Sequence, residues 1–389
     1  MRCIRGTLAL ALSSALCLSA CGENSEPIRV GATMSATGAY ATQGIAARNG
    51  YELCASHVNA AGGVLGRPIE LVIYDDESSS EQARILYQQL ITADKVDAIM
   101  GPYGSTLTEA VAPITERYRM VHISPLAATT SIWEQGRHHL FMVLPPAELF
   151  LVGLLELAKE QGLEKVAVLQ EQALFPAAAA SGAVAHAKAN GLAVLEHYTY
   201  PSGTADFSAY LNDMAERGVE VLAMTASALD DFISVRSQLN VLGIELQLFG
   251  NSGAVDQYYA ALGEAADGDL GLSAWEPSVP NPGAGAFVTA YEETYGLAPS
   301  FHAAGGYGSC QLFVQAIETA GSLHSDAMRE ALLNMDTQTV FGAFKVDKRG
   351  YQIANQGVFV QWQQGRKEVV WPAELATAPL QLPALNRAQ

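Results

Sequence analysis

Hydrophobic and polar positions alternate along the chain in two ways, one typical of buried strands and one typical of amphipathic helices. The runs "IRVGATM" (28–34) and "IELVIYDD" (69–76) are short and apolar, whereas "GIAARNGYELCASHVNAAGG" (44–63) has helical spacing and ends in two glycines. A second series of the same kind includes "KVAVLQ" (165–170) and "VEVLAMT" (219–225). Apolar strands that alternate with helices predict parallel sheets covered on both faces, and two series predict two lobes.

Two segments that contain prolines, and the C-terminal part of the chain, interrupt this alternation. "FMVLPPAE" (141–148) and "LGLSAWEPSVPNPG" (270–283) are expected to be crossovers between the lobes. Residues 339–372 alternate apolar and polar positions around Gly turns, which predicts antiparallel strands. The pattern as a whole predicts an α/β protein with two doubly wound, parallel-sheet lobes.

The composition is that of a folded protein with an acidic balance. Of 389 residues, 49% are hydrophobic and 16% are charged, which excludes a disordered chain. Because 22 Lys and Arg stand against 40 Asp and Glu, the net charge is −18. This charge argues against nucleic acid or an anionic membrane surface as a partner.

The first twenty residues are expected to be a signal peptide. Arg2 and Arg5 precede the apolar run "LALALSSALCLSA", which is shorter than the roughly 20 residues that a spanning helix needs. The stretch "LSAC" (18–21) resembles the bacterial lipobox, a resemblance that implies cleavage after Ala20 and lipidation of Cys21. We therefore expect an exported protein in the periplasm or at the cell surface, anchored to a membrane by lipid.

Two cysteines, Cys54 and Cys310, remain in the exported part once Cys21 is lipidated. Both have apolar neighbours at helical spacing, which favours two buried free thiols; a disulfide is the alternative, since the exported compartment permits one. Neither residue belongs to a cluster of Cys and His of the kind that binds a metal, so we expect no metal and no cofactor.

Motifs of catalysis are missing from the sequence. It contains no GxSxG, HExxH, CxxC or GxxxxGK[ST]. The acidic pairs Asp75–Asp76 and Asp230–Asp231 stand next to predicted helix starts, where free backbone N–H groups stabilise carboxylates, so we interpret both pairs as structural. The sequence therefore favours binding without turnover.

Two loops rich in small and hydroxyl residues follow neighbouring predicted strands. They are "GPYGST" (101–106) and "SPLAATTS" (124–131). Ligands of open parallel sheets bind beyond the carboxyl ends of the strands, and a helix start offers unpaired N–H groups to an anion. For either loop alone a helix N-cap is the preferred interpretation; the two loops together favour a site for a carboxylate or an amide as much as two N-caps.

Five stretches between residue 28 and about residue 350 carry a family resemblance: "IRVGATMSATGAYATQG", "VNAAGGVLGRPIELVIYDDESS", "DKVDAIMGPYGS", "YGLAPSFHAAGGYGSCQLFVQAIETAGS" and "GAFKVDKRGYQ". They resemble the leucine/isoleucine/valine-binding solute receptors of ABC importers, which are type I periplasmic binding proteins. The resemblance implies two lobes joined by three crossovers, the third near residues 344–350. The implied boundaries are 1–20 for the signal peptide, 28–143 plus 275–346 for lobe I, and 144–274 plus 347–389 for lobe II.

The same resemblance implies a set of ligand-binding residues. The carboxylate-binding Ser falls on Ser105, and the other implied positions are Tyr103, Gly104, Ala127 or Ala128, Thr129, Gln43 with Tyr40 close by, Phe175 and His302. His302 has two interpretations, a ligand contact or a residue at a helix end. One residue more than in the best-known members stands between Pro125 and Thr129, which affects the register of that loop.

One departure from the family concerns the partner of an amino acid's ammonium group. Members that bind α-amino acids place an acid after a strand of the second lobe, where this chain has Asn251 in "GNSG" (250–253). A desolvated ammonium without an anion costs several kcal/mol, so either another acid such as Asp230 reaches the ligand or the ligand has no ammonium. Branched-chain or other apolar amino acids stay first by resemblance; amides, keto acids and aromatic carboxylates are the alternatives.

The partners implied by the resemblance are a small organic solute and an ABC permease in the inner membrane. Two other classes of protein remain open on the sequence alone. One is an exported enzyme that acts on small amides or acids, and the other is a ligand sensor that signals to a regulator or a membrane kinase.

Overall fold

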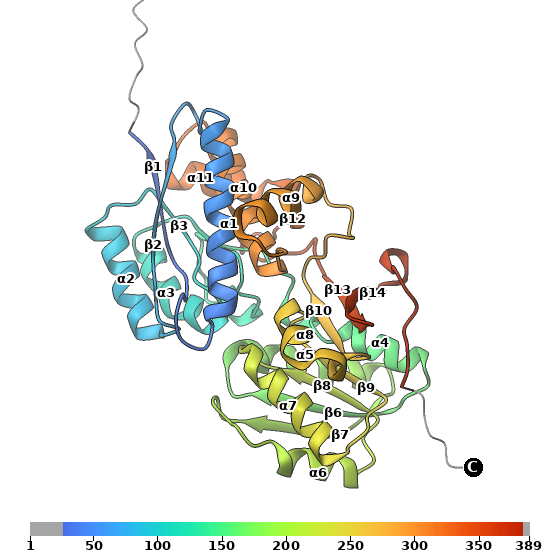
Figure 1. Cartoon of the computed structure of the whole chain (residues 1–389). Coiled ribbons are helices and arrows are strands. Elements are labelled where there is room, and N and C mark those ends of the chain that lie inside the picture. The colour runs from blue at the N-terminus through green and yellow to red at the C-terminus, as the bar shows by residue number, and fades with distance from the viewer. Residues whose placement is uncertain (1–25, 384–389) are drawn as a thin grey trace, which may run out of the picture.

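The computed structural model describes residues 26–383, which form two bodies, each built around one large sheet (Figure 1). We call the body around the five-stranded sheet lobe I and the body around the seven-stranded sheet lobe II. The predicted signal peptide and Cys21 lie outside the described residues. No helix in the described part of the chain is long and apolar enough to cross a membrane.

The sheet of lobe I has the strand order β2-β1-β3-β4-β5, and all its neighbours are parallel. Its strands are β1 (Ile28–Thr33), β2 (Ile69–Tyr74), β3 (Ala98–Met100), β4 (His122–Ser124) and β5 (Leu140–Met142). The intervening helices are α1 (Ala41–Ala60), α2 (Ser80–Thr92), α3 (Ser105–Arg117) and the 3-10 turn η1 (Thr130–Ile132). Most residues of these strands are buried because helices cover both faces of the sheet.

The sheet of lobe II has the strand order β14-β13-β10-β9-β8-β6-β7. Its parallel strands are β6 (Lys165–Glu171), β7 (Ala193–Tyr200), β8 (Val221–Thr225), β9 (Leu248–Asn251) and β10 (Leu270–Ser273). Two antiparallel strands, β13 (Val358–Gln363) and β14 (Arg366–Trp371), extend it at the β10 edge. Its helical elements are η2 (Ala147–Leu149), α4 (Val152–Glu160), α5 (Leu174–Ala189), α6 (Ser208–Glu216), α7 (Leu229–Leu242), α8 (Asp256–Leu262), η3 (Gly263–Ala266) and η4 (Ala373–Leu375).

Between β10 and β13 the chain returns to lobe I, where α10 packs along α1 (Figure 1). The elements of this return are α9 (Ala284–Tyr295), α10 (Phe301–Ala320), α11 (Ser325–Leu333) and the hairpin of β11 (Asp336–Thr339) with β12 (Gly342–Lys345). The chain thus passes between the two sheets three times: after β5, after β10 and after β12. The predicted α/β fold with parallel sheets is confirmed, and so are the antiparallel strands near the C-terminus.

The two segments expected to be crossovers each begin inside a sheet. Residues 140–142 form β5, which pairs with β4, and residues 270–273 form β10, which pairs with β9 and β13. Both strands are fully buried and only three or four residues long. Prolines follow both strands, and because of these prolines the short apolar runs before them were assigned to the crossovers and not to strands.

Cys54 and Cys310 form a disulfide between α1 and α10, so the expectation of two free thiols is wrong. The two helices touch backbone to backbone. A Cβ at Gly306 would collide with the carbonyl oxygen of Ala47, and a Cβ at Gly50 would collide with the backbone of α10. This close approach brings two buried sulfur atoms together across 256 residues of sequence.

The acidic pair after β2 holds the loop between β1 and α1. Asp76 is fully buried and accepts hydrogen bonds from the hydroxyls of Thr33 at 2.6 Å and Ser35 at 2.5 Å. Asp75 accepts a bond from the backbone N–H of Ala36 at 2.8 Å. The pair therefore has a structural role, but it fixes the loop that leads into α1 more than the start of α2, whose N-cap is Ser79.

Candidate ligand-binding site

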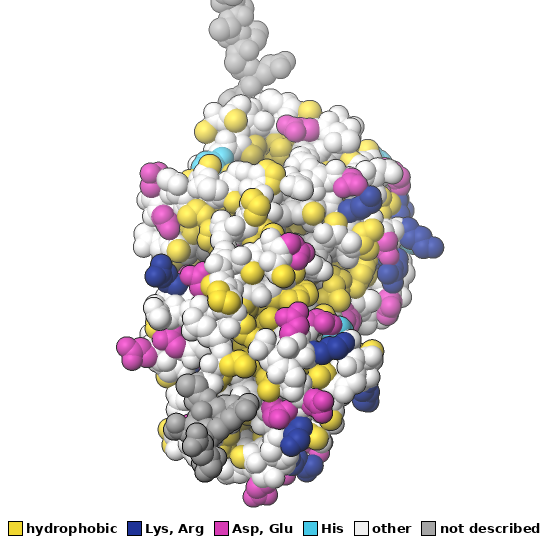
Figure 2. All heavy atoms as spheres, turned by 90° about the vertical axis from the view of Figure 1, so that its right-hand side faces the viewer, with side chains coloured by type: hydrophobic (Ala, Val, Ile, Leu, Met, Phe, Trp, Pro, Cys, Tyr) yellow, Lys and Arg dark blue, Asp and Glu magenta, His cyan; other side chains and the backbone are white. Residues whose placement is uncertain are grey.

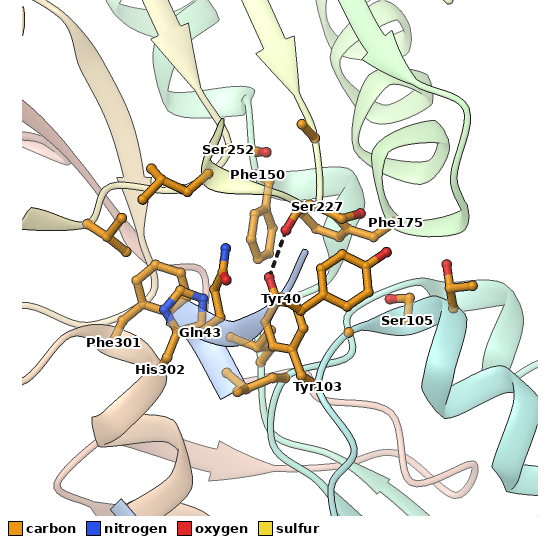
Figure 3. Close-up of a pocket in the computed structure, with 18 of the residues that line it drawn as sticks. Tyr40, Gln43, Tyr103, Ser105, Phe150, Phe175, Ser227, Ser252, Phe301 and His302 are labelled. Carbon is orange, nitrogen blue, oxygen red and sulfur yellow. Dashed lines mark hydrogen bonds between the residues drawn. The ribbon is translucent and has the colours of Figure 1, made fainter. Parts of the chain in front are cut away.

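A pocket lies between the two lobes, at the carboxyl ends of strands from both sheets (Figure 3). The empty space among its walls, open solvent included, is about 680 Å³, which is in the range of small-molecule sites. Lobe I contributes Tyr40, Gln43, Tyr103, Gly104, Ser105, Thr106, Leu107, Leu126, Leu144, Phe301 and His302. Lobe II contributes Phe150, Phe175, Ala226, Ser227, Leu229, Phe232, Ser252, Gly253 and Val255.

Most of the residues named from the sequence lie at this pocket. Those that line it are Gln43, Tyr103, Gly104, Ser105, Phe175 and His302. Four others do not line the pocket and are buried, each at most 3% exposed: Ala127, Ala128, Thr129 and Asn251. The contribution of all ten residues to binding stays a prediction.

Ser105 begins α3 and connects the two loops that the sequence singled out. Its hydroxyl oxygen accepts bonds from the backbone N–H groups of Ala128 at 3.1 Å and Thr129 at 3.2 Å. Residues 127–129 of the second loop therefore lie behind Ser105, and Leu126 is the residue of this loop that lines the pocket. Before it, Gly104 has φ +77° and open space where a Cβ would be, so a ligand can approach the backbone there. The hydroxyl hydrogen of Ser105 and the first N–H groups of α3 are suited to a carboxylate.

Asn251 does not take the place of the missing acid. Its side chain is buried in its own turn, where Oδ1 accepts a bond from the Gly253 N–H at 3.0 Å. The next residue, Ser252, lines the pocket, and its hydroxyl has no partner among the described residues. Asp230, the other acid considered for an ammonium group, is exposed and does not line the pocket.

Aromatic rings form much of the pocket wall, and sequence reasoning did not identify three of them, Phe150, Phe232 and Phe301, as pocket residues. Phe150 meets Phe175 edge to face, with 5.0 Å between ring centroids. Each of the three stands in or beside the first turn of a helix, where an aromatic residue is equally typical of a core. Their position beyond the ends of strands could have identified them as pocket residues, but only once the order of the strands in each sheet was known.

Charge is absent from the wall: none of the described residues that line the pocket is Asp, Glu, Lys or Arg. Burial, with a smaller effect of Lys367, lowers the pKa of His302 to about 3, so its imidazole is neutral at physiological pH. Burial, followed by the charge of Glu171, raises the pKa of the Tyr40 phenol to about 12. The site therefore presents neutral hydrogen-bonding groups on an aromatic surface.

Two buried acids of lobe II lie behind this wall. Glu171 accepts a bond from the backbone N–H of Ser227 at 2.8 Å, and the Ser227 carbonyl accepts a bond from Tyr103 Oη of lobe I at 3.2 Å (Figure 3). Asp231 accepts a bond from Tyr200 Oη at 2.8 Å, and burial raises its pKa to about 6. Both carboxylates are thus engaged within the protein, while Tyr103 connects the lobes directly.

The family of this chain follows from comparison with known proteins. A sequence model of the family described as periplasmic binding protein matches residues 27–367. The Leu/Ile/Val-binding protein homolog 8 of Brucella abortus (strain 2308) is 27% identical over 399 residues, with 97% of each chain covered.

Solved structures share the fold. The leucine binding protein LivK of Thermotoga maritima MSB8 superposes with a TM-score of 0.81 at 23% identity, covering 88% of this chain and 97% of that one. A solute binding protein of an ABC transporter from R. palustris, solved with benzoate, has a TM-score of 0.79 at 20% identity, covering 88% and 95%. Since the family match spans most of the sequence, the chain belongs to the periplasmic binding protein family.

Proposed function

We propose that the protein is the substrate-binding component of an ABC importer and that its ligand is a small carboxylate with an apolar or aromatic body and no ammonium group. Family membership and the names of the relatives support the transport role. The ligand is held between the lobes and passed on to a permease in the inner membrane. In this role the protein binds and releases its ligand unchanged, and it has no catalytic residues.

The ligand class rests on one observation: an uncharged pocket wall with a helix start at Ser105. A carboxylate gains the N–H groups and dipole of α3, which together favour an anion. An ammonium would be desolvated without an acid beside it, at a cost of several kcal/mol. The aromatic rings supply the contact area for the body of the ligand.

Branched-chain amino acids are the second candidate. The names of the relatives favour them, and the solved structures include both a leucine binding protein and a benzoate complex. Glu171 is a buried acid of lobe II that contacts the pocket wall through the N–H of Ser227. An amino acid would therefore require the loop at Ser227 to shift on ligand binding, so that its ammonium group can reach Glu171.

Matched pairs of ligands that differ only in the ammonium group separate the two candidates. We expect 4-methylpentanoate and 3-phenylpropanoate to bind at least about ten-fold more tightly than L-leucine and L-phenylalanine, because each amino acid has an unpaired buried charge. Isothermal titration calorimetry measures the four dissociation constants. Tighter binding of either amino acid than of its partner contradicts the proposed ligand class.

The same samples test the transport role against an enzyme. Chromatography after incubation should return each bound acid unchanged, and the bound protein should melt at a higher temperature than the empty protein. A new product in the chromatogram would support an exported enzyme instead.

A further inference from the structure

Two polar side chains of the pocket come from the starts of α1 and α10. These helices run parallel and in contact, with Ala47 against Gly306 and Cys54 bonded to Cys310. Gln43 lies four residues before Ala47, and His302 lies four residues before Gly306. One helical turn below a direct backbone contact, the two side chains therefore enter the pocket as neighbours.

Gln43 carries hydrogen-bonding capacity that the protein does not use. The side chain is 5% exposed, and its Oε1 has no hydrogen-bond partner among the described residues. A buried carbonyl oxygen without a partner is costly, and native proteins leave few of them. Because Gln43 lines the pocket, a ligand is positioned to supply the missing donor.

His302 adds a second neutral group at the same place. It is 5% exposed, its ring lies 5.7 Å from the ring of Tyr103 between centroids, and no ion pair in the described structure holds it. A neutral imidazole has one nitrogen that donates and one that accepts. A group that donates to Gln43 Oε1 and accepts from the N–H of His302 satisfies both, and a hydroxyl can do this.

The pair stands away from the helix start at Ser105. In Figure 3, Gln43 and His302 lie on one side of the Tyr40 and Tyr103 rings, and Ser105 lies on the other. The two rings are themselves in contact, with 5.3 Å between centroids. A ligand whose carboxylate is at Ser105 therefore extends along aromatic rings toward two neutral polar groups.

We propose that the ligand carries a hydroxyl group at the end opposite its carboxylate, and that Gln43, assisted by His302, recognises this hydroxyl. The inference rests on the proposed function and narrows it to hydroxylated aryl carboxylates. An ammonium at this end is disfavoured, because the wall there has no anion, whereas a hydroxyl supplies both a donor and an acceptor. Gln43 is on this account a specificity-determining residue.

Calorimetry with 4-hydroxyphenylacetate and phenylacetate tests the proposal. The wild-type protein should bind the hydroxylated acid roughly ten-fold more tightly, because the acid without a hydroxyl leaves Gln43 Oε1 unpaired. In Gln43→Met, which keeps the length of the side chain and removes its polar atoms, this ratio of dissociation constants should fall toward about one. Gln161→Met, at an exposed position outside the pocket, should keep the wild-type ratio.

Each remaining outcome overturns the inference in a recognisable way. If both acids bind the wild-type protein equally well, or if Gln43→Met keeps the ratio, the hydroxyl proposal is wrong and the carboxylate class stands. If neither acid binds, and the acids without an ammonium group do not bind either, the proposed ligand class is wrong together with this inference. Thermal unfolding of each variant confirms that the comparison is made on folded protein.

Discussion

At the scale of single residues, Ser105 illustrates how a site residue can also be a structural one. From the sequence, its hydroxyl was expected to meet the ligand. The structure shows that the same oxygen accepts two backbone N–H groups, from Ala128 and Thr129. All three residues are buried, so the Ser105 hydroxyl determines where the second loop sits whether or not a ligand is bound. A loss of binding in a Ser105 variant therefore has two possible causes.

Ser105→Ala is expected to destabilise the protein in the absence of any ligand. The change leaves the N–H groups of Ala128 and Thr129 without an acceptor in a buried place, which costs about 1–3 kcal/mol of unfolding free energy. Denaturant titration of the empty protein measures this difference. Thr106→Ala, at the next and exposed position of α3, is the control and should stay within about 0.5 kcal/mol. Equal stability of the two variants would mean that the Ser105 bonds contribute nothing.

Individual residues also show how much of the site could be predicted from the sequence. Gln43, Tyr103 and Ser105 were named because the family resemblance places ligand contacts at these positions, and all three line the pocket. Asn251 was expected just after a strand and is the last residue of β9, and the direction of its side chain depends on a bond from the Gly253 N–H inside its own turn. Phe301 was missed because an aromatic residue at a helix start looks the same in a core and in a pocket.

At the scale of elements, the alternation of apolar runs and helices predicted the order of strands and helices well. It failed for β5 and β10, which are short, buried and followed at once by residues that break the pattern. It also gave no information on how α1 and α10 pair. Their contact depends on glycines that permit close approach, whereas a periodic pattern does not show which helix packs against a given helix face. The disulfide depends on that pairing, so the sequence offered it only as the alternative to two free thiols.

Breaking the bond between Cys54 and Cys310 should lower stability. Cys54→Ala, Cys310→Ala and the double variant are each expected to lose about 2–4 kcal/mol, since a bond across 256 residues restricts the unfolded chain. Melting curves of these variants, and of the wild-type protein with and without a thiol reductant, provide the measurement. The double variant should resemble the single ones because all three lack the same bond. An unchanged melting temperature after confirmed reduction would contradict this role.

At the scale of the whole molecule, two bodies face each other across the pocket. Residues of both lobes line the pocket, so the site exists only when both lobes are present. A sequence without catalytic motifs can therefore still have a well-defined binding site. The face turned toward the viewer in Figure 2 shows hydrophobic side chains at the level between the lobes, with charged side chains above and below. Sequence patterns described each lobe but not this arrangement, because the distance between lobes is set by three passages of the chain.

The position of the molecule in the cell is a prediction at this scale. We propose that Cys21 is lipidated and tethers the mature protein to a membrane, because "LSAC" (18–21) resembles the bacterial lipobox. Cys21→Ser should therefore move the protein from the membrane fraction to the soluble fraction of lysed cells, as seen by immunoblotting. Binding to ligands should be the same in both fractions, since the substitution changes none of the described residues that line the pocket. A variant that stays with the membrane would require another anchor.

The glycine-mediated contact of α1 with α10 has a consequence for the range of ligands that evolution or engineering can reach. With no side chains between the two backbones and a covalent bond further along, these helices cannot spread to admit a bulkier molecule. Additional space for a ligand must come from smaller side chains at the starts of these two helices or from a wider angle between lobe II and lobe I. New specificities should accordingly arise by exchange of residues such as Gln43 and His302 on an unchanged frame.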